Sequence, residues 1–226
     1  MSGLRLVVFD VDGTLVDSQA HILAAMARAF AATGRPSPPR EAVLDIVGLS
    51  LPVAMARLSP AALSEVPVLV DAYREAFADL RLSGGDAALS PLYPGARDCL
   101  SALASEPWTL LGVATGKSRR GLTHLFELHD LGSTFQTVQV ADDHPSKPHP
   151  AMLEACLSET GADAARSVMI GDTTYDIEMG RAAGFRTIGV SWGYHPAEAL
   201  HAAGAHAVID DFAALLTVLA EGLETS

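Results

Sequence analysis

The hydrophobic positions of this chain follow a pattern that alternates between two kinds of segment. Five of the six residues from Leu4 to Phe9 are apolar, and a short apolar run bounded by Asp and Gly is typical of a buried strand in a parallel sheet. Apolar residues recur at helical spacing between most of the apolar runs, so the pattern predicts parallel βα units with right-handed connections. Further strands are predicted near residues 108–114, 135–140, 167–170, 187–190 and 207–209.

The segment between residues 17 and 89 has a helical pattern and contains no run that resembles a buried strand. Its first predicted helix places Ile22, Met26 and Phe30 at helical spacing. Ser18 is the expected N-cap of this helix, and Gly34 is expected just after its C-terminus. Further helices are predicted at 41–46, 53–58 and about 66–80.

These patterns predict an α/β fold in which a Rossmann-like parallel sheet forms the core and an all-helical unit is inserted. The chain has 226 residues, of which 49% are hydrophobic, and this is enough for a large core and a smaller second unit. The hinges between the two units would lie near Leu15–Ser18 and Leu89–Pro91. We expect the core to comprise residues 1–16 and 90–226, and the insertion to comprise residues 17–89.

Charge and cysteine content narrow the range of functions. The net charge of −12 argues against nucleic acid as a partner, because proteins bind nucleic acid chiefly through Lys and Arg. A site for a phosphate ester would therefore need its own local positive field. Cys99 and Cys156 lack the spacing of a metal site and are expected to be core residues of a reduced protein. With no apolar run near ~18 residues and no signal-peptide pattern, a cytoplasmic location without membrane contact is expected.

Polar side chains occur where predicted strands end, which is the edge at which open α/β sheets bind ligands. Asp10 and Asp12 follow the first strand, Thr115 follows the second, and the segment GDTTYD carries Asp172 and Asp176. A loop adds one lysine, at position 147. Carboxylates hold Mg²⁺, whereas a lysine and a threonine hydroxyl bind phosphoryl oxygens, and a carboxylate can also form an aspartyl phosphate. The set predicts chemistry on a phosphoryl group.

These segments resemble the four ordered motifs of haloacid dehalogenase-type (HAD) phosphatases. The motifs are Phe9–Leu15 (FDVDGTL), Ala114–Gly116 (ATG), Lys147–Pro148 and Gly171–Asp176 (GDTTYD). The helical insertion directly after the first motif is similar to the cap of the phosphoglycolate phosphatase and β-phosphoglucomutase subfamily. The resemblance covers essentially the whole chain, and four motifs in order are a far more specific signal than any one alone.

The resemblance implies roles for three aspartates. Asp10 would be the nucleophile that forms the phosphoaspartate. Asp12 would be the general acid for the leaving group and then the base for the attacking water. The Asp10 carboxylate, the backbone carbonyl of Asp12 and the Asp172 carboxylate would be the protein ligands of Mg²⁺.

The resemblance also implies roles for the residues around the phosphoryl group. Thr115, Gly116 and Lys147 would bind the phosphoryl group during its transfer. Asp176 would lie behind Asp172 and orient a water molecule or Lys147. Two simpler interpretations stay open, since Asp176 could N-cap the next helix and Thr115 could satisfy a turn amide.

The resemblance further favours a phosphatase acting on a small phosphorylated metabolite. The dehalogenase branch of the family lacks the carboxylate that corresponds to Asp12, because its leaving group needs no proton. In β-phosphoglucomutase-like enzymes the cap loop carries basic residues, whereas residues 46–56 here have no charge and Arg57 is the nearest base. This departure favours hydrolysis of a small monophosphate ester, and phosphoglycolate is the leading substrate by resemblance only.

Other functions are compatible with parts of the sequence. A β-phosphoglucomutase-like phosphotransferase or a pyrophosphatase could use the same fold. A receiver-like signalling protein also combines acidic residues, a threonine and a lysine around Mg²⁺, but such domains are shorter and lack the insertion. A catalytically silent phosphate-binding protein is a further alternative. The sequence predicts neither the oligomeric state nor the natural substrate.

Several charged residues near the motifs have no assigned role. Lys117, Arg119 and Arg120 form a basic cluster that would either steer a phosphate or simply begin a solvated helix. His195 is expected to brace a loop rather than to catalyse. One acidic pair, Asp142 and Asp143, is interpreted as a solvated turn.

Overall fold

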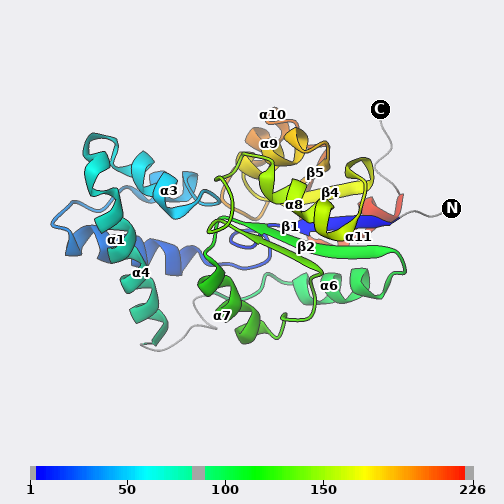
Figure 1. The fold of residues 1–226 in the computed structure, drawn as a ribbon, viewed down its shortest axis with the longest axis horizontal. Helices are drawn as coiled ribbons and strands as arrows, with labels where there is room; N and C mark the ends of the chain where they lie inside the picture. Colours follow the sequence, from blue (N-terminus) through cyan, green and yellow to red (C-terminus); the bar gives the residue numbers. More distant parts are fainter. Residues whose placement is uncertain (1–3, 83–89, 222–226) are drawn as a thin grey trace.

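A six-stranded, fully parallel sheet lies at the centre of the protein (Figure 1). The structure is a computed structural model, and it describes residues 4–82 and 90–221. The strands follow the order β3-β2-β1-β4-β5-β6, so the chain winds outward from β1 in both directions. They are β1 (Arg5–Phe9), β2 (Thr109–Thr115), β3 (Thr137–Val140), β4 (Ser167–Gly171), β5 (Arg186–Val190) and β6 (Ala207–Ile209).

Helices cover both faces of the sheet and confirm the predicted α/β core. Side chains of β1 alternate between the faces, as in any strand. Val7 and Phe9 pack in the cluster that includes the helices of one face, and Leu6 and Val8 pack in the cluster of the other. The first face carries α6 (Ala96–Ser105), α7 (Arg119–His129) and α11 (Phe212–Glu221), and the second carries α8 (Ala151–Thr160) and α9 (Thr174–Ala182); α10 (Ala197–Ala202) packs against β5 and β6.

Both cysteines are free and buried, as the sequence predicted. Cys99 lies in the cluster on the α6 side of the sheet, and Cys156 lies in the cluster on the α8 side. Burial raises the pKa of each thiol to about 12, so neither is activated as a nucleophile. Among the described residues, no helix combines the length and the apolar character that crossing a membrane requires.

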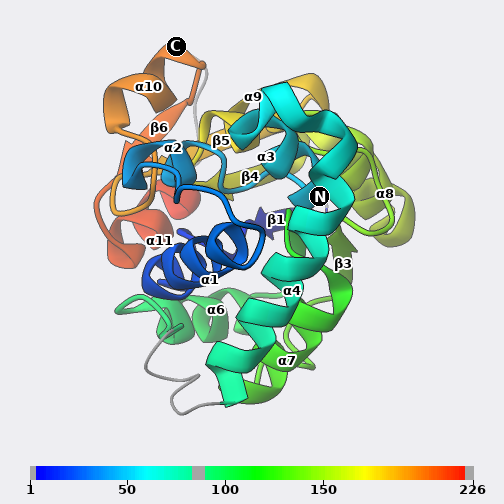
Figure 2. The ribbon, with the colours of Figure 1, turned by 90° about the vertical axis from the view of Figure 1, so that its left-hand side faces the viewer.

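The insertion forms a separate group of helices beside the carboxyl ends of the strands (Figures 1 and 2). Its apolar faces share their own hydrophobic cluster, which includes Met26, Met55 and Leu69. We refer to this group as the cap. Its helices are α1 (Gln19–Ala32), α2 (Arg40–Asp45), α3 (Leu51–Leu58), the 3₁₀ helix η1 (Pro60–Glu65) and α4 (Val66–Leu82).

Two chain passages connect the cap to the core, and their described parts lie side by side. Val16 forms an antiparallel bridge with Leu92, and the Asp17 amide donates to the Pro91 carbonyl at 2.9 Å. The expected second hinge begins at Leu89, which lies outside the described residues. The proposed division into core and cap therefore remains a prediction, as does the motion of its hinges.

The first cap helix begins and ends where the sequence predicted, but the side chain at its N-cap position has a different partner. Gly34 follows the helix with a φ of +70°, a left-handed conformation that suits glycine after a helix C-terminus. The expected N-cap role of Ser18 is wrong as far as its side chain is concerned, because the hydroxyl caps no helical amide. It donates instead to Asp12 Oδ1. The helix begins only a few residues after the first motif, and the buried carboxylate of Asp12 needs a hydrogen-bond donor.

One of the two buried leucines of α6 offers a test of the core. Leu103 is fully buried in the larger cluster, so Leu103→Ala should lower the free energy of unfolding by about 3 kcal/mol through lost burial and a residual cavity. Leu82→Ala is the matched control, because Leu82 is 81% exposed and its truncation should change stability by less than about 0.5 kcal/mol. Urea unfolding measures both, and equal losses would contradict this packing.

Candidate active site

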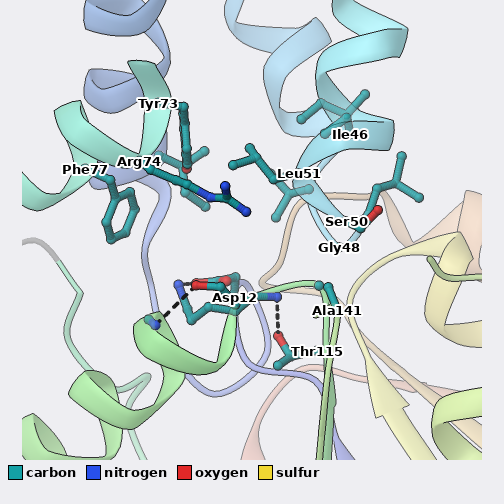
Figure 3. A pocket seen from close by; sticks show the side chains of 18 of the residues that line it. Asp12, Ile46, Gly48, Ser50, Leu51, Tyr73, Arg74, Phe77, Thr115 and Ala141 are labelled. Atoms are coloured by element: carbon teal, nitrogen blue, oxygen red, sulfur yellow. Dashed lines mark hydrogen bonds and ion pairs between the residues drawn. The ribbon is translucent and has the colours of Figure 1, made fainter. Parts of the chain in front are cut away.

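The polar residues of the motifs converge because of the strand order. β1 pairs with β2 on one side and with β4 on the other, so the residues after these three strands share one edge of the sheet. This edge is also where the direction of winding reverses, the place at which open α/β sheets bind ligands. A cavity of about 640 Å³ lies between this edge and the cap, and Asp10, Asp12 and Thr115 line its core side (Figure 3).

Lys147 holds the buried carboxylates together. Its Nζ lies 2.6 Å from Asp10 Oδ1 and 2.6 Å from Asp176 Oδ1, and all three side chains are almost fully shielded from solvent. Burial lowers the pKa of Lys147, but the two carboxylates outweigh this effect and raise it. The lysine therefore stays charged. Burial raises the pKa of Asp10 to about 7, against the opposing charge of Lys147 and with a further increase from Asp176.

Asp172 follows β4 and is enclosed by the turn after β1. Its Oδ1 accepts from the Thr14 hydroxyl at 2.9 Å, and its Oδ2 accepts from the Tyr194 amide at 2.9 Å. A Cβ on Gly13 would lie 2.2 Å from Asp172 Oδ2, so the glycine of the first motif is needed for this close approach. Burial, followed by repulsion from Asp10 and Asp176, raises the pKa of Asp172 well above its usual value.

The carboxylates fit a hard cation. Oxygens of Asp10, Asp172 and Asp176 all lie within 4.8 Å of one another, and only one lysine charge offsets them in direct contact. Among the described residues, Asp10 Oδ2 is the one buried side-chain polar atom without a hydrogen-bond partner. A buried carboxylate oxygen that only accepts is costly unless a donor or a cation meets it. An all-oxygen donor set of this kind suits Mg²⁺.

Asp176 is held by other contacts on both of its oxygens. Oδ1 receives Lys147, and Oδ2 accepts from the Thr173 hydroxyl at 2.7 Å and the Thr173 amide at 3.1 Å. Thr173 is the N-cap of α9, and Asp176 completes a capping box with it. Asp176 is therefore not the N-cap itself, but from the N3 position its carboxylate bonds to the N-cap residue and also contacts Lys147.

Asp12 lies between the core and the cap at the side of the cavity. Its Oδ1 accepts from Ser18 and forms an ion pair with Lys117 Nζ at 3.0 Å. Lys117 also lies 5.2 Å from the centre of the Phe77 ring on α4. Lys117, for which the sequence predicted no definite role, thus contacts Asp12 of the first motif, Thr115 of the second motif and Phe77 of the cap.

The second motif places a hydroxyl and a glycine at the cavity. Thr115 ends β2, and its Oγ1 accepts from the Lys117 amide at 3.2 Å (Figure 3). This contact is the expected turn bond, but it leaves the hydroxyl hydrogen available to a ligand. A Cβ on Gly116 would lie 2.4 Å from the Gly48 carbonyl oxygen, so Gly116 allows the cap loop to approach.

The cap loop is fastened to the core by polar contacts that surround the site. The Ser50 amide donates to Ser146 Oγ at 2.9 Å. On α9, the Tyr175 hydroxyl donates to the Asp45 carbonyl at 2.8 Å and accepts from Arg57 at 2.6 Å. Arg57 is the basic residue nearest to the uncharged loop. It donates to Tyr175 of the core and does not line the cavity.

The remaining charged residues have mostly structural contacts. His195 Nδ1 accepts from the Thr174 amide at 3.1 Å, which agrees with the expected bracing role. Arg119 pairs with Asp143, and its amide donates to Asp142 Oδ2 at 2.8 Å. The acidic pair thus lies in an exposed turn after β3, as interpreted from the sequence, and contacts Arg119 at the start of α7.

Sequence reasoning missed the contribution of α4 to the site. Arg74 and Arg81 line the cavity together with Tyr73 and Phe77. The signal was present, because Tyr73, Phe77 and Arg81 recur every four residues on one helical face. This spacing is typical of any amphipathic helix, and it does not show that the face with Tyr73 and Phe77 continues into a cavity.

The pairing of Lys147 makes a prediction about stability in the absence of metal. Lys147→Met should lower the free energy of unfolding by about 3–5 kcal/mol, because it leaves two buried carboxylates without their counter-charge. Urea unfolding in the presence of EDTA measures the loss. Asp176→Asn added to Lys147→Met should recover part of it. The matched control is Lys117→Met. Asp12, the partner of Lys117, would keep its hydrogen bond from Ser18, so this variant should lose less free energy of unfolding than Lys147→Met. An equal or larger loss would contradict the account.

Comparison with known proteins agrees with this geometry. The profile of the haloacid dehalogenase-like hydrolases matches residues 7–190. A probable phosphatase, IndB, of Dickeya dadantii is 37% identical over 92% of this chain and 90% of its own length. Phosphoglycolate phosphatase of Pseudomonas putida is 32% identical over 94% of this chain and 78% of its own length.

Solved structures show the same fold. The crystal structure of a predicted phosphatase from Clostridium acetobutylicum superposes with a TM-score of 0.85 over 98% of this chain and 100% of its own, at 23% identity. The family profile covers most of the sequence, and the two named relatives span nearly all of it. The chain belongs to the haloacid dehalogenase-like hydrolase family.

Proposed function

We propose that this protein is a Mg²⁺-dependent phosphatase that hydrolyses phosphomonoesters of small metabolites through a phosphoaspartate on Asp10. The observation that carries the proposal is the arrangement around Lys147, which presents Asp10 next to Asp172 while Asp12 lines the same cavity. The names of the relatives support the reaction class, since they are phosphatases.

In the first step the Asp10 carboxylate attacks the phosphorus atom. A bond forms between Asp10 and phosphorus while the ester P–O bond breaks, and Asp12 transfers a proton to the departing oxygen. In the second step Asp12 takes a proton from water, the water oxygen bonds to phosphorus, and the bond to Asp10 breaks. Inorganic phosphate leaves, and both aspartates return to their starting states.

Other residues of the chain hold the phosphoryl group and the nucleophile. Lys147 fixes one oxygen of Asp10 and offers positive charge to the phosphoryl oxygens, while the Thr115 hydroxyl and the Gly116 turn contact the same group. Mg²⁺, held by Asp10, Asp172 and the backbone carbonyl of Asp12, would supply charge neutralisation for the phosphoryl oxygens. Asp176 positions Lys147 from behind.

Transfer to water is favoured over transfer to a second sugar. The cap loop that lines the cavity carries no charged side chain, and Arg57 is bonded to Tyr175. In β-phosphoglucomutase-like enzymes the basic residues for the second phosphate lie in this loop, and the loop offers none here; the cap cations that line the cavity, Arg74 and Arg81, lie on α4 instead. Phosphoglycolate is the leading named substrate because several relatives bear that name.

The nucleophile is tested by Asp10→Asn. An amide has no charge with which to attack phosphorus, so phosphate release should fall by at least about 10³-fold while the fold is retained. Phosphate release from phosphoglycolate and p-nitrophenyl phosphate, with and without Mg²⁺, provides the measurement. Full activity of the variant, or activity independent of the metal, would be incompatible with the proposed mechanism.

The proton-transfer residue is tested by Asp12→Asn. The variant should slow both formation and breakdown of the phosphoenzyme by about 10²–10⁴-fold, because it removes the general acid and base. Mg²⁺ affinity should be spared, since the expected ligand is the backbone carbonyl of Asp12. Rapid-quench kinetics and calorimetric Mg²⁺ titration separate the two effects. A large loss of Mg²⁺ binding would show that the side chain itself is a ligand.

A further inference from the structure

The cap side of the cavity is an apolar wall. Figure 3 shows Leu51 and Phe77 facing the space above Asp12, with Tyr73 beside them. Leu51, Tyr73 and Phe77 pack against the hydrophobic cluster of the cap but are only half-buried, so part of each side chain remains exposed. We call these three residues, together with Ala78 on α4, the cap wall.

The cavity is large for a two-carbon leaving group. Its volume of about 640 Å³ corresponds to on the order of 20 water molecules at about 30 Å³ each. Cavities of roughly 300–1,000 Å³ enclose ligands the size of drugs or cofactors. A bound glycolate ester would leave most of the cap wall facing water. Its binding would therefore gain little of the free energy that burial of this apolar surface can contribute.

The polar groups of the cavity lie near its core side and at α4. Arg74 projects from α4 toward the space above Asp12 (Figure 3). Arg81 on α4 and Arg120 on α7 line the same cavity. A guanidinium group is planar, stacks on flat rings and donates hydrogen bonds to ring acceptors. Tyr73 adds an aromatic surface, whereas the Phe77 ring already stacks on His21, with the ring centroids 3.6 Å apart, and has Lys117 Nζ 5.2 Å from its centroid.

We propose that the natural leaving group is larger than glycolate and carries a planar ring that packs against the cap wall. The inference rests on the proposed phosphatase function and names the class of substrate. The phosphoryl group binds beside Asp10 and Thr115, and the alcohol extends toward α4, where Tyr73, Phe77 and Arg74 contact its ring. The substrates are phosphomonoesters of ring-bearing alcohols.

Matched substrates test this inference without a change in the chemistry of the leaving group. We compare kcat/KM for ethyl phosphate with 2-phenylethyl phosphate, and for ribose 5-phosphate with a nucleoside 5′-monophosphate. Each pair differs by one ring far from the ester oxygen. Burial of the ring should raise kcat/KM by about ten- to hundredfold in at least one pair, and that ring-bearing ester should exceed phosphoglycolate.

Filling the cavity tests the location of the ring. Ala78→Phe places a side chain in the proposed ring site and should lower the ratio of kcat/KM within the matched pair by at least about tenfold. Ala27→Phe is the control, because Ala27 lies on the exposed face of α1, and it should leave the ratio unchanged. Leu51→Phe on α3 serves as a second filling variant if Ala78→Phe does not fold by circular dichroism.

The outcomes separate this inference from the proposed function. If phosphoglycolate is hydrolysed and the ring has no effect in either pair, the phosphatase function stands and the inference is wrong. If the ring raises kcat/KM but neither filling variant changes the ratio, the ring does not bind at the cap wall and the proposed site is overturned. If no ester releases phosphate, the proposed function fails and the inference fails with it.

Discussion

The ion pairs of Lys147 are the constraint on which the rest of the site depends. Three buried carboxylates within a few ångströms would repel one another strongly, and Lys147 is the cation in direct contact with two of them. Both lysines of the chain are used here, since Lys117 pairs with the fourth carboxylate, Asp12. Four carboxylates still face two lysines, so the proposed binding of a phosphate ester needs the further positive charge of a cation. The ion pair on Asp10 leaves the other oxygen of this carboxylate without a partner, which agrees with the proposed roles of Asp10 as metal ligand and nucleophile.

The cap and the core meet through the same residues that form the site. Gly116 permits the approach of the cap loop at Gly48, and Ser18 and Lys117 connect Asp12 to the segments that carry the cap. A change in the cap position would therefore alter the surroundings of the proposed general acid directly. The cap also supplies the cap wall, so in the proposed reaction the same unit would exclude water from the reacting atoms and contact the leaving group. In this proposal the residues at the strand ends carry out the reaction, and the cap helices select the substrate.

Much of this could be predicted from the sequence because it depends on local patterns. The apolar runs identified the strands, and the motif residues directly after β1, β2 and β4 had to share one edge once the strands were parallel. The contacts of Ser18 and Lys117 with Asp12 could not be predicted, since they depend on how the helices after two different strands are oriented. The role of the α4 face was also hidden: the periodicity of Tyr73 and Phe77 is the same for a buried stripe and for a cavity wall. A buried stripe and a cavity wall differ only in what the helix faces in the folded protein. Tyr73 faces the same cavity as Asp12, although the two residues are more than 60 positions apart in the sequence.

The central claim is that Asp10 becomes covalently phosphorylated during turnover. It is tested most directly by mixing the protein with Mg²⁺ and a hydrolysed ester, quenching in acid within milliseconds, and mapping modified peptides by mass spectrometry. The account predicts one phosphoryl group on the peptide that contains Asp10, formed and lost at rates consistent with steady-state turnover. Turnover without any phosphorylated peptide, or with the phosphoryl group on a different residue, would contradict it.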